Sequence, residues 1–294
     1  MSLTDKRNKV ALIGKGYWGS KLLKYIPNHF DLVAVADSKT DLKQIWSSDI
    51  ESVIIATPIQ THYELTKEAL LAGKNVYVEK PLALKYEQGI EIVNIAREKG
   101  LRLDVEYTQM FSKGLQYIQS KDIGEIEFIE MSTKHLGRFV DYDVFWLLVS
   151  HHLSVLPMFF SLLDLDFNFK KYMFHNGICT TGSIECLKKG TDKIKAKLDV
   201  SLNYYKKEFC INVYGTKGFA KYDATNQIPV SITWYEKKRS VLPNEMIIGV
   251  ENIRFDEMNN LELSIKHFKD LIEGRDVDNL DIALEITRIL ENGG

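Results

Sequence analysis

The chain has 294 residues, of which 45% are hydrophobic and 27% are charged, and its formal net charge is −2 at pH 7. This composition is typical of a water-soluble globular protein, and the length is sufficient for two domains. The near balance of acidic and basic residues argues against nucleic acid or an anionic membrane as a partner. No apolar run reaches the roughly 18 residues that a membrane-spanning helix needs.

The cysteine and histidine content predicts no metal site. Cys179, Cys186 and Cys210 are odd in number and lack metal-ligand spacing, so we expect packing roles in a reducing compartment. The segment Met1–Lys9 is polar and lacks the apolar core of a signal peptide. We therefore expect a cytoplasmic protein without a bound metal. Four histidines also lack ligand spacing, namely His29, His135, His175 and His267.

Short apolar segments alternate with helical segments over the first third of the chain. Strands are expected at Lys9–Ile13, Leu32–Ala36, Ser52–Ala56, Asn75–Val78 and Leu101–Tyr107. Helices are expected at Trp18–Tyr25, His62–Leu71 and Tyr86–Lys99. Gly73 and Gly100 follow the last two helices, where a helix C-cap favours glycine. The alternation predicts a parallel, doubly wound sheet.

The first expected strand runs directly into a G-x-G-x-x-G turn and then a helix. Gly14 permits a tight turn, Gly16 lets the backbone approach a pyrophosphate, and Gly19 allows the helix to pack closely on the strand. Free N–H groups at the start of a helix favour phosphate. The turn therefore predicts a dinucleotide-binding domain of the Rossmann type.

Asp37 ends the second expected strand, a little over 20 residues after the first glycine of the turn. A carboxylate at this position binds the ribose hydroxyls of an adenosine and repels a 2′-phosphate. We therefore expect NAD rather than NADP, a preference that Lys39 moderates. Tyr17 and Trp18 either cover the pyrophosphate or, in the case of Trp18, pack in the core.

After Gly114 the pattern changes to many strands. A helix is expected at Leu115–Ser120, a strand at Glu125–Thr133 and a helix over Phe145–Leu163. Further strands are expected at Phe167–Phe174, Gly177–Cys186, Ala196–Tyr204, Glu208–Tyr214, Phe219–Asp223 and Ser231–Glu236, and terminal helices at Leu261–Glu273 and Asp281–Glu291. The pattern predicts an α+β domain with a mostly antiparallel sheet that is open on one face.

We therefore predict an α/β protein with two domains. Residues 1–118 form the dinucleotide-binding Rossmann domain, and residues 119–294 form a substrate-binding and oligomerisation domain whose terminal helices are free to pack back on the first. The cleft between the domains is the expected active site. The open sheet face is expected to join copies of the chain into a homodimer or homotetramer.

Four longer motifs accompany the glycine turn. They are Ile55–Pro58 (I-A-T-P) with His62, Ala72–Pro81 (A-G-K-N-V-Y-V-E-K-P), Asp122–Ile126 (D-I-G-E-I) and Val213–Phe219 (V-Y-G-T-K-G-F). With these motifs the chain resembles the Gfo/Idh/MocA oxidoreductases, named for glucose–fructose oxidoreductase and inositol dehydrogenase. The likeness extends from Val10 to beyond Gly218. It implies an NAD(P)-dependent dehydrogenase or reductase that acts on CH–OH groups.

A narrower likeness lies in the second domain. His135–Arg138, Asp141–Trp146 and Ser150–Ser154 resemble a branch that contains sugar-nucleotide dehydrogenases, whose usual pattern is N-L-G-R followed by D-V-N-V-L-W-D-L-A-P-H-D-L-S. The branch implies hydride transfer between nicotinamide and a hydroxyl or ketone of a sugar or nucleotide sugar.

The motif ending in Glu79, Lys80 and a proline carries the first candidate catalytic residue. Lys80 follows the fourth strand at the edge where ligands bind in such folds, so its ammonium can donate to the substrate oxygen or stabilise it. The resemblance implies that Glu79 lies beside the cofactor and that Thr57 and Pro58 line its cleft. His62 either touches the cofactor or is only a polar residue near a helix start.

His151 aligns with the family's catalytic histidine, with the adjacent His152 as the alternative acid/base. An imidazole can take the hydroxyl proton as hydride leaves the carbon. The family usually places an acid one helical turn before this histidine, but this chain has Leu147 there. Met110 stands where many relatives carry arginine, and Ser150 and His152 replace the branch's Pro and Asp. These departures keep two alternatives open: a biliverdin-reductase-like enzyme with a non-sugar substrate, and a cofactor-binding protein with little or no catalysis.

Overall fold

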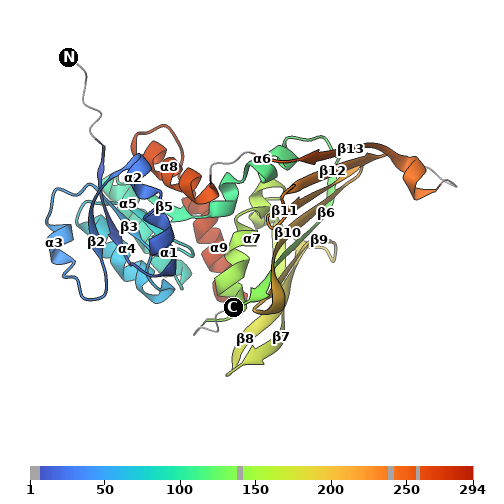
Figure 1. The fold of residues 1–294 in the computed structure, drawn as a ribbon. Helices are drawn as coiled ribbons and strands as arrows, with labels where there is room; N and C mark the ends of the chain where they lie inside the picture. Colours follow the sequence, from blue (N-terminus) through green and yellow to red (C-terminus); the bar gives the residue numbers. More distant parts are fainter. Residues whose placement is uncertain (1–6, 138–141, 238–241, 256–258, 294) are drawn as a thin grey trace, which may run out of the picture. The chain divides into compact units, whose positions relative to one another are not determined.

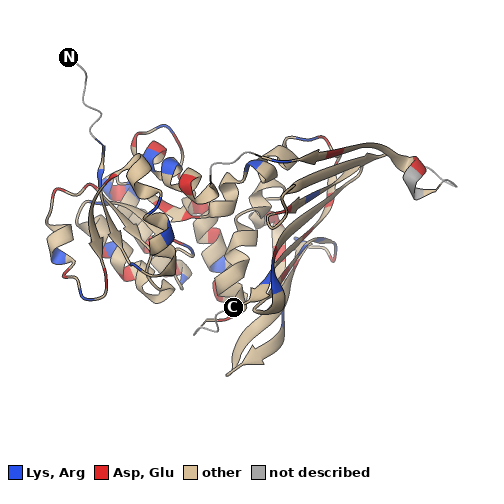
Figure 2. Ribbon diagram, viewed as in Figure 1, with Lys and Arg blue, Asp and Glu red and all other residues tan. Residues whose placement is uncertain are grey.

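The computed structural model describes residues 7–137, 142–237, 242–255 and 259–293 (Figure 1). The chain divides into two compact units, one comprising Met1–Phe111 with Met258–Glu291 and the other Ser112–Glu257 with Asn292–Gly294. No helix within the described ranges has the length and apolar character to cross a membrane. Acidic and basic residues are interspersed along both units and do not gather by sign (Figure 2).

The first unit contains a five-stranded parallel sheet in the order β2-β1-β3-β4-β5. Its strands are β1 (Lys9–Ile13), β2 (Asp31–Ala36), β3 (Ser52–Ile55), β4 (Asn75–Glu79) and β5 (Leu103–Glu106). Four of these strands are almost entirely buried, because helices cover both faces of such a sheet. The carboxyl ends of β1 to β5 therefore lie along one edge, where loops can carry a ligand site.

Helices and short helical turns complete the first unit. They are α1 (Tyr17–Leu22), α2 (Ile26–His29), α3 (Lys43–Trp46), η1 (Ile59–Thr61), α4 (His62–Leu71), α5 (Tyr86–Lys99), η2 (Thr108–Phe111), α8 (Asn260–Ile272) and α9 (Leu280–Gly293). The helix α8 comes from the far end of the chain, as its red colour in Figure 1 shows. The ring of its Phe268 lies 5.8 Å from that of Phe30 and 5.5 Å from that of Tyr77. The core of this unit therefore depends on a segment distant in sequence.

The first helix is shorter than the expected Trp18–Tyr25, because Pro27 begins the separate helix α2. Proline fits the first turn of a helix but cannot continue one, since it lacks an N–H and clashes with the preceding turn. The short helix α3 was not expected.

The second unit contains an eight-stranded sheet in the order β13-β12-β11-β10-β6-β9-β8-β7. Its strands are β6 (Ile126–Leu136), β7 (Leu165–His175), β8 (Ile178–Lys188), β9 (Ile194–Ser201), β10 (Asn203–Gly215), β11 (Gly218–Asp223), β12 (Val230–Tyr235) and β13 (Ile247–Ile253). The pair β6–β9 is parallel and the other neighbouring pairs are antiparallel. The predicted α/β fold class, with a Rossmann-like sheet and a mostly antiparallel second sheet, is confirmed.

The helix expected over Phe145–Leu163 is helical only as far as Leu153. A π-helical turn, η3 (Phe145–Val149), leads into the single-turn helix α7 (Ser150–Leu153), and two short 3₁₀ turns follow. Pro157 explains the break, because a proline ring clashes with the carbonyl four residues earlier, here that of Leu153.

Three other expectations about the second unit also change. The helix α6 (Lys113–Gln119) belongs to this unit, because Gly114 packs directly against Tyr222 and Val230; the boundary therefore lies after Phe111 and not after residue 118. The two strands expected around residues 196–214 are divided instead at Leu202, so that β10 is one long strand. The edge strand β13 was not expected, since it is mostly exposed and lacks an apolar alternation.

Candidate functional site

The glycine turn after β1 has the geometry of a phosphate-binding loop. Gly14 has φ +100°, and a Cβ there would lie 2.6 Å from the carbonyl carbon of Ala56. A Cβ on Gly19 would overlap the carbonyl oxygen of Gly14, whereas a Cβ on Gly16 would meet nothing within 4 Å. Gly14 and Gly19 are therefore required by packing, and Gly16 leaves open backbone that a pyrophosphate can approach.

Asp37 is oriented by the loop that follows β2. Its Oδ1 accepts hydrogen bonds from the Lys39 N–H at 2.9 Å and the Thr40 hydroxyl at 3.3 Å, while its own N–H donates to Thr40 Oγ1 at 3.0 Å. The side chain is exposed. This arrangement presents a carboxylate in a fixed direction, which suits recognition of ribose hydroxyls.

Tyr17 and Trp18 form an exposed aromatic pair at the start of α1. Their exposed fractions are 51% and 41%, and the Lys21 ammonium lies 4.3 and 4.5 Å from the two ring centroids. The alternative that Trp18 packs in the core is therefore wrong. Two exposed rings with a half-buried lysine beside the glycine turn are compatible with a cover over the pyrophosphate, and this role stays a prediction.

His62 is a buried clamp between two loops. Its Nδ1 lies 2.8 Å from the carbonyl oxygen of Pro81 and its Nε2 lies 2.9 Å from that of Thr57. The ring is 1% exposed and His62 begins α4, which fits the alternative of a polar residue at a helix start; contact with the cofactor stays a prediction. Both neighbours are acceptors, so only a doubly protonated ring donates to both. Burial lowers the pKa of His62, the two carbonyls raise it, and the charge of Lys80 lowers it.

Thr57 and Pro58 lie at the carboxyl end of β3. Thr57 is half-buried and its hydroxyl accepts a hydrogen bond from Thr61 at 2.7 Å, whereas Pro58 is exposed. The contact between His62 and the Thr57 carbonyl oxygen therefore fixes the backbone of a loop in which Pro58 is exposed to solvent.

Lys80 lies between two acids at the ends of β4 and β5. Glu79 and Glu106 are partners in the parallel register and are 5% and 2% exposed. The half-buried Lys80 follows Glu79, and its peptide bond to Pro81 is cis. Burial lowers the pKa of Lys80, while the two glutamates raise it. Glu106 had no predicted role, and only the strand register brings it to this site.

A second buried charge cluster lies between β5 and α8. His267 Nδ1 is 2.8 Å from an oxygen of Asp276, and its Nε2 is 3.6 Å from an oxygen of the fully buried Asp104. Burial lowers the pKa of His267, but the two aspartates outweigh it and raise the pKa to about 9. The histidine is therefore a half-buried cation at neutral pH. No group of three or more His, Cys, Asp or Glu side chains in the described part of the chain is placed to hold a metal ion.

His151 and His152 occupy different environments on α7 in the second unit. His152 is fully buried, its Nε2 lies 2.7 Å from Thr133 Oγ1, and burial lowers its pKa to about 3. It is therefore a neutral core residue and unsuited to proton exchange. His151 is half-buried and remains the candidate acid/base of this unit.

The acid that relatives place near this histidine has no substitute among the described residues of the preceding turn. Trp146 and Leu147 occupy the positions one helical turn before His151. Asp143 is engaged elsewhere, since it accepts the Phe145 N–H at 3.0 Å and pairs with Lys171 at 3.3 Å. The motif residues Arg138 and Asp141 lie outside the described residues.

The structure thus gathers most of the predicted site residues in the first unit. They follow the carboxyl ends of β1 to β4, and they are Gly14, Gly16, Gly19, Asp37, Thr57, Pro58, His62, Glu79 and Lys80. His151 belongs to the second unit.

Comparisons with known proteins agree with this geometry. Residues 34–107 match the sequence model of an oxidoreductase family with an NAD-binding Rossmann fold. Over 124 residues, 36% of this chain and 33% of the relative, the sequence is 32% identical to 2,7-anhydro-N-acetylneuraminate hydratase of Mediterraneibacter gnavus. Alignments with the curated relatives span less than half of those proteins, between 23% and 47% of their length.

Solved structures share the fold over nearly the whole chain. UDP-N-acetylglucosamine 3-dehydrogenase GnnA from Acidithiobacillus ferrooxidans has a TM-score of 0.83 at 17% identity, covering 97% of this chain and 96% of that protein. GenD2 from gentamicin A biosynthesis, solved in complex with NAD, has a TM-score of 0.80 at 19% identity, with 99% and 94% covered. The resemblance predicted from the motifs is confirmed over residues 34–107, which match the NAD-binding Rossmann fold of the Gfo/Idh/MocA oxidoreductase family.

Proposed function

We propose that this protein is an NAD-dependent oxidoreductase that transfers hydride between nicotinamide and a hydroxyl or ketone carbon of a sugar or nucleotide sugar. The observation that carries the proposal is the position of Lys80. Lys80 precedes Pro81, whose carbonyl oxygen contacts His62, and two buried acids end the neighbouring strands at the same sheet edge as the open glycine turn. A dinucleotide site and a proton donor on one edge are what hydride transfer to or from an alcohol requires.

The residues present fit a dinucleotide. The open backbone at Gly16 would hold the pyrophosphate, and the oriented carboxylate of Asp37 would bind the ribose hydroxyls and disfavour a 2′-phosphate. NAD, when bound, supplies the hydride acceptor. NAD over NADP remains part of the proposal, and the NAD complex of the similarly folded GenD2 supports it.

Lys80 is the proposed proton donor to the substrate oxygen. Its ammonium stabilises negative charge on that oxygen during oxidation and gives up a proton during reduction. His151 is the proposed second acid/base. Leu147 supplies no carboxylate to orient its ring or raise its basicity, so we expect Lys80 to carry the larger share of the proton chemistry.

The replacement of the family's usual acid by Leu147, one turn before His151, favours a second candidate function. A reductase of a non-sugar substrate needs only the proton from Lys80, and a cofactor-binding protein without turnover needs neither group. The sugar substrate class rests on the named activities of the similar proteins, which act on UDP-N-acetylglucosamine and on 2,7-anhydro-N-acetylneuraminate.

A nicotinamide fluorescence titration tests these proposals. NADH and NADPH are titrated first, and UDP-sugars, dTDP-sugars and free polyols are then added to the same sample. Tighter binding of NADH and a sugar-dependent change in reduced cofactor are the expected results. NADH binding with no response across the panel, together with full activity of His151→Ala on a non-sugar ketone, would favour the second candidate.

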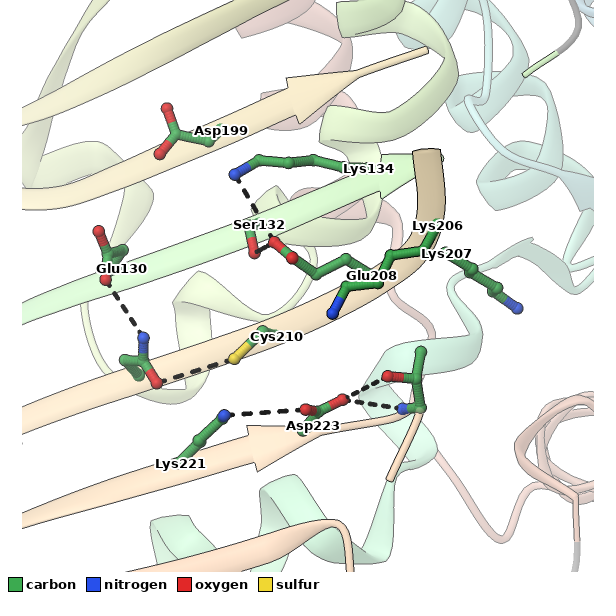
Figure 3. A pocket seen from close by; sticks show the side chains of 12 residues that line it. Glu130, Ser132, Lys134, Asp199, Lys206, Lys207, Glu208, Cys210, Lys221 and Asp223 are labelled. Atoms are coloured by element: carbon green, nitrogen blue, oxygen red, sulfur yellow. Dashed lines mark hydrogen bonds and ion pairs between the residues drawn. The ribbon is translucent and has the colours of Figure 1, made fainter. Parts of the chain in front are cut away.

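The outer face of the second sheet is the proposed contact between copies of the chain. A depression of about 300 Å³ lies over β6, β9, β10 and β11 and is lined by charged side chains of both signs (Figure 3). Lys134 lies 3.6 Å from Glu208, and Lys221 lies 3.8 Å from Asp223. Mixed charges on one face suit pairing with a second copy of the same face. Light scattering should show a dimer or tetramer, and a monomer would refute this contact.

A further inference from the structure

Two buried carboxylates lie near Lys80. Together they carry more negative charge than its single ammonium group can neutralise. Glu79 and Glu106 face each other across neighbouring strands, and both are more than nine-tenths buried. Glu79 Oε1 has no hydrogen-bond partner among the described residues, whereas Glu106 Oε1 accepts the Thr108 hydroxyl at 2.5 Å. An unsatisfied buried carboxylate oxygen is costly unless a proton or a ligand compensates it.

Charge balance predicts that the two acids share a proton. With both carboxylates and Lys80 ionised, the buried group would carry one net negative charge, and one bound proton removes it. Burial raises the pKa of Glu79 well above its ordinary range. Burial also raises the pKa of Glu106, to about 7, although the Thr108 hydrogen bond and Lys80 lower it. One proton is therefore exchangeable near neutral pH.

The surroundings of Glu106 explain why the proton stays there. The buried phenols of Tyr77 and Tyr107 stay neutral, because burial raises both pKa values, so neither offsets the negative charge of the two glutamates. Asp104, on the same strand, adds negative charge that raises the pKa of Glu106. The cation His267 lies on the far side of Asp104 and pairs with it. Lys80 is the cation that lowers the pKa of Glu106 directly.

We propose that Glu106, with Glu79, holds the proton that passes through Lys80 during the reaction. The inference rests on the proposed function. In the oxidation direction an N–H bond of the Lys80 ammonium breaks as its proton passes to the ionised Glu106 carboxylate, and the neutral amine then forms a new N–H bond with the proton released from the substrate O–H. In the reduction direction both transfers run in reverse, so that the glutamic acid reprotonates Lys80. Protons balance at every step, and Glu106 acts through Lys80 as a positioning and proton-holding residue.

The pKa of Glu106 can be measured in the cofactor-free protein, independently of turnover. Infrared difference spectra across a pH titration report the carboxylic acid C=O band. We expect a band that titrates near neutral pH in the wild type and is lost in Glu106→Gln. Glu98→Gln is the matched control, because Glu98 is an exposed carboxylate on α5 and its removal should leave the band unchanged.

Two further variants test the coupling without removing the acid. Thr108→Val deletes the hydrogen bond that favours the ionised form, so the titration should move to higher pH by roughly half a unit to one unit. Lys80→Met deletes the positive charge and should also move it upward. These two variants keep the proposal testable if Glu106→Gln does not fold. Absence of a neutral band in the wild type, or no shift in Lys80→Met, would overturn the proposal.

Turnover separates this inference from the proposed function. Glu106→Gln should lower kcat by roughly 10²-fold or more and remove the neutral limb of the pH–rate profile, with a much smaller change in KM. If the neutral limb of the wild-type pH–rate profile persists in Glu106→Gln, the proton-holding role of Glu106 is overturned and hydride transfer is unaffected. The carboxylic acid band could shift in Thr108→Val and Lys80→Met although the wild type turns over no substrate. That result would overturn the proposed function and, with it, the role of the Glu106 proton in turnover.

Discussion

Gly16 and Gly19 offer a matched pair of substitutions that separates cofactor access from packing. Gly16 has φ −72°, which any residue adopts, and an added Cβ would meet nothing within 4 Å. An added Cβ on Gly19 would overlap the carbonyl oxygen of Gly14 and lie 3.0 Å from its carbonyl carbon. The same chemical change therefore reaches open space in one case and backbone in the other.

The two variants should differ in both stability and binding. Gly16→Ala should leave the free energy of unfolding within about 0.5–1 kcal/mol of the wild type, since the alanine is unstrained. Gly19→Ala should lower it by about 1–3 kcal/mol or more, because backbone must move. The methyl of Gly16→Ala occupies the approach of the pyrophosphate, so NADH affinity should fall at least tenfold, about 1.4 kcal/mol.

Urea unfolding measures the first difference and NADH fluorescence titration measures the second. A Gly16→Ala variant that binds NADH as tightly as the wild type would refute the placement of the pyrophosphate at this turn. A Gly19→Ala variant as stable as the wild type would refute the packing argument. Equal loss of stability in both variants would show that the turn is structural throughout.

Three further perturbations test other parts of the site. Lys80→Met should abolish turnover with NADH affinity near wild type, and an unchanged kcat would reject its role. His62→Leu should cost about 1–3 kcal/mol for each carbonyl that loses its hydrogen-bond donor, measured by urea unfolding; no loss of stability would reject the role of His62 in joining the two loops. The pKa of His267 rises on folding from 6.5 to about 9, so its contribution is complete below pH 6.5 and is lost as pH rises through 9. Wild-type stability should fall by about 2–3 kcal/mol over that window, and His267→Phe should not show this fall.

Local sequence patterns were sufficient for the fold class and for the residues at the strand ends. The strand, glycine turn and helix are contiguous, and parallel strands bring their carboxyl ends to one edge. Gly14, Asp37 and Lys80 could therefore be assigned to that edge from the sequence. Element boundaries were less certain where one residue decides them, as Pro157 does after α7.

Burial and partners across the chain were decided only by the tertiary structure. His151 and His152 are adjacent, and the sequence alone does not distinguish their surroundings. In the structure His152 is buried against β6, whereas His151 is half-buried. His62 reaches two carbonyls because β3 and β4 are neighbours in the sheet.

The sequence by itself determined the glycine turn, the α/β class and the resemblance to the oxidoreductase family, because each depends on short contiguous motifs. The pairing of Glu106 with Glu79, and the placement of His267 beside Asp104, required the register of β4 and β5 and the return of α8 to the first unit. The physical reason is that the pKa of a carboxylate or imidazole depends on desolvation and on charges brought close by folding. Those surroundings come from segments far apart along the chain. Local motifs therefore identify the ionisable residues of the site but do not predict their protonation states.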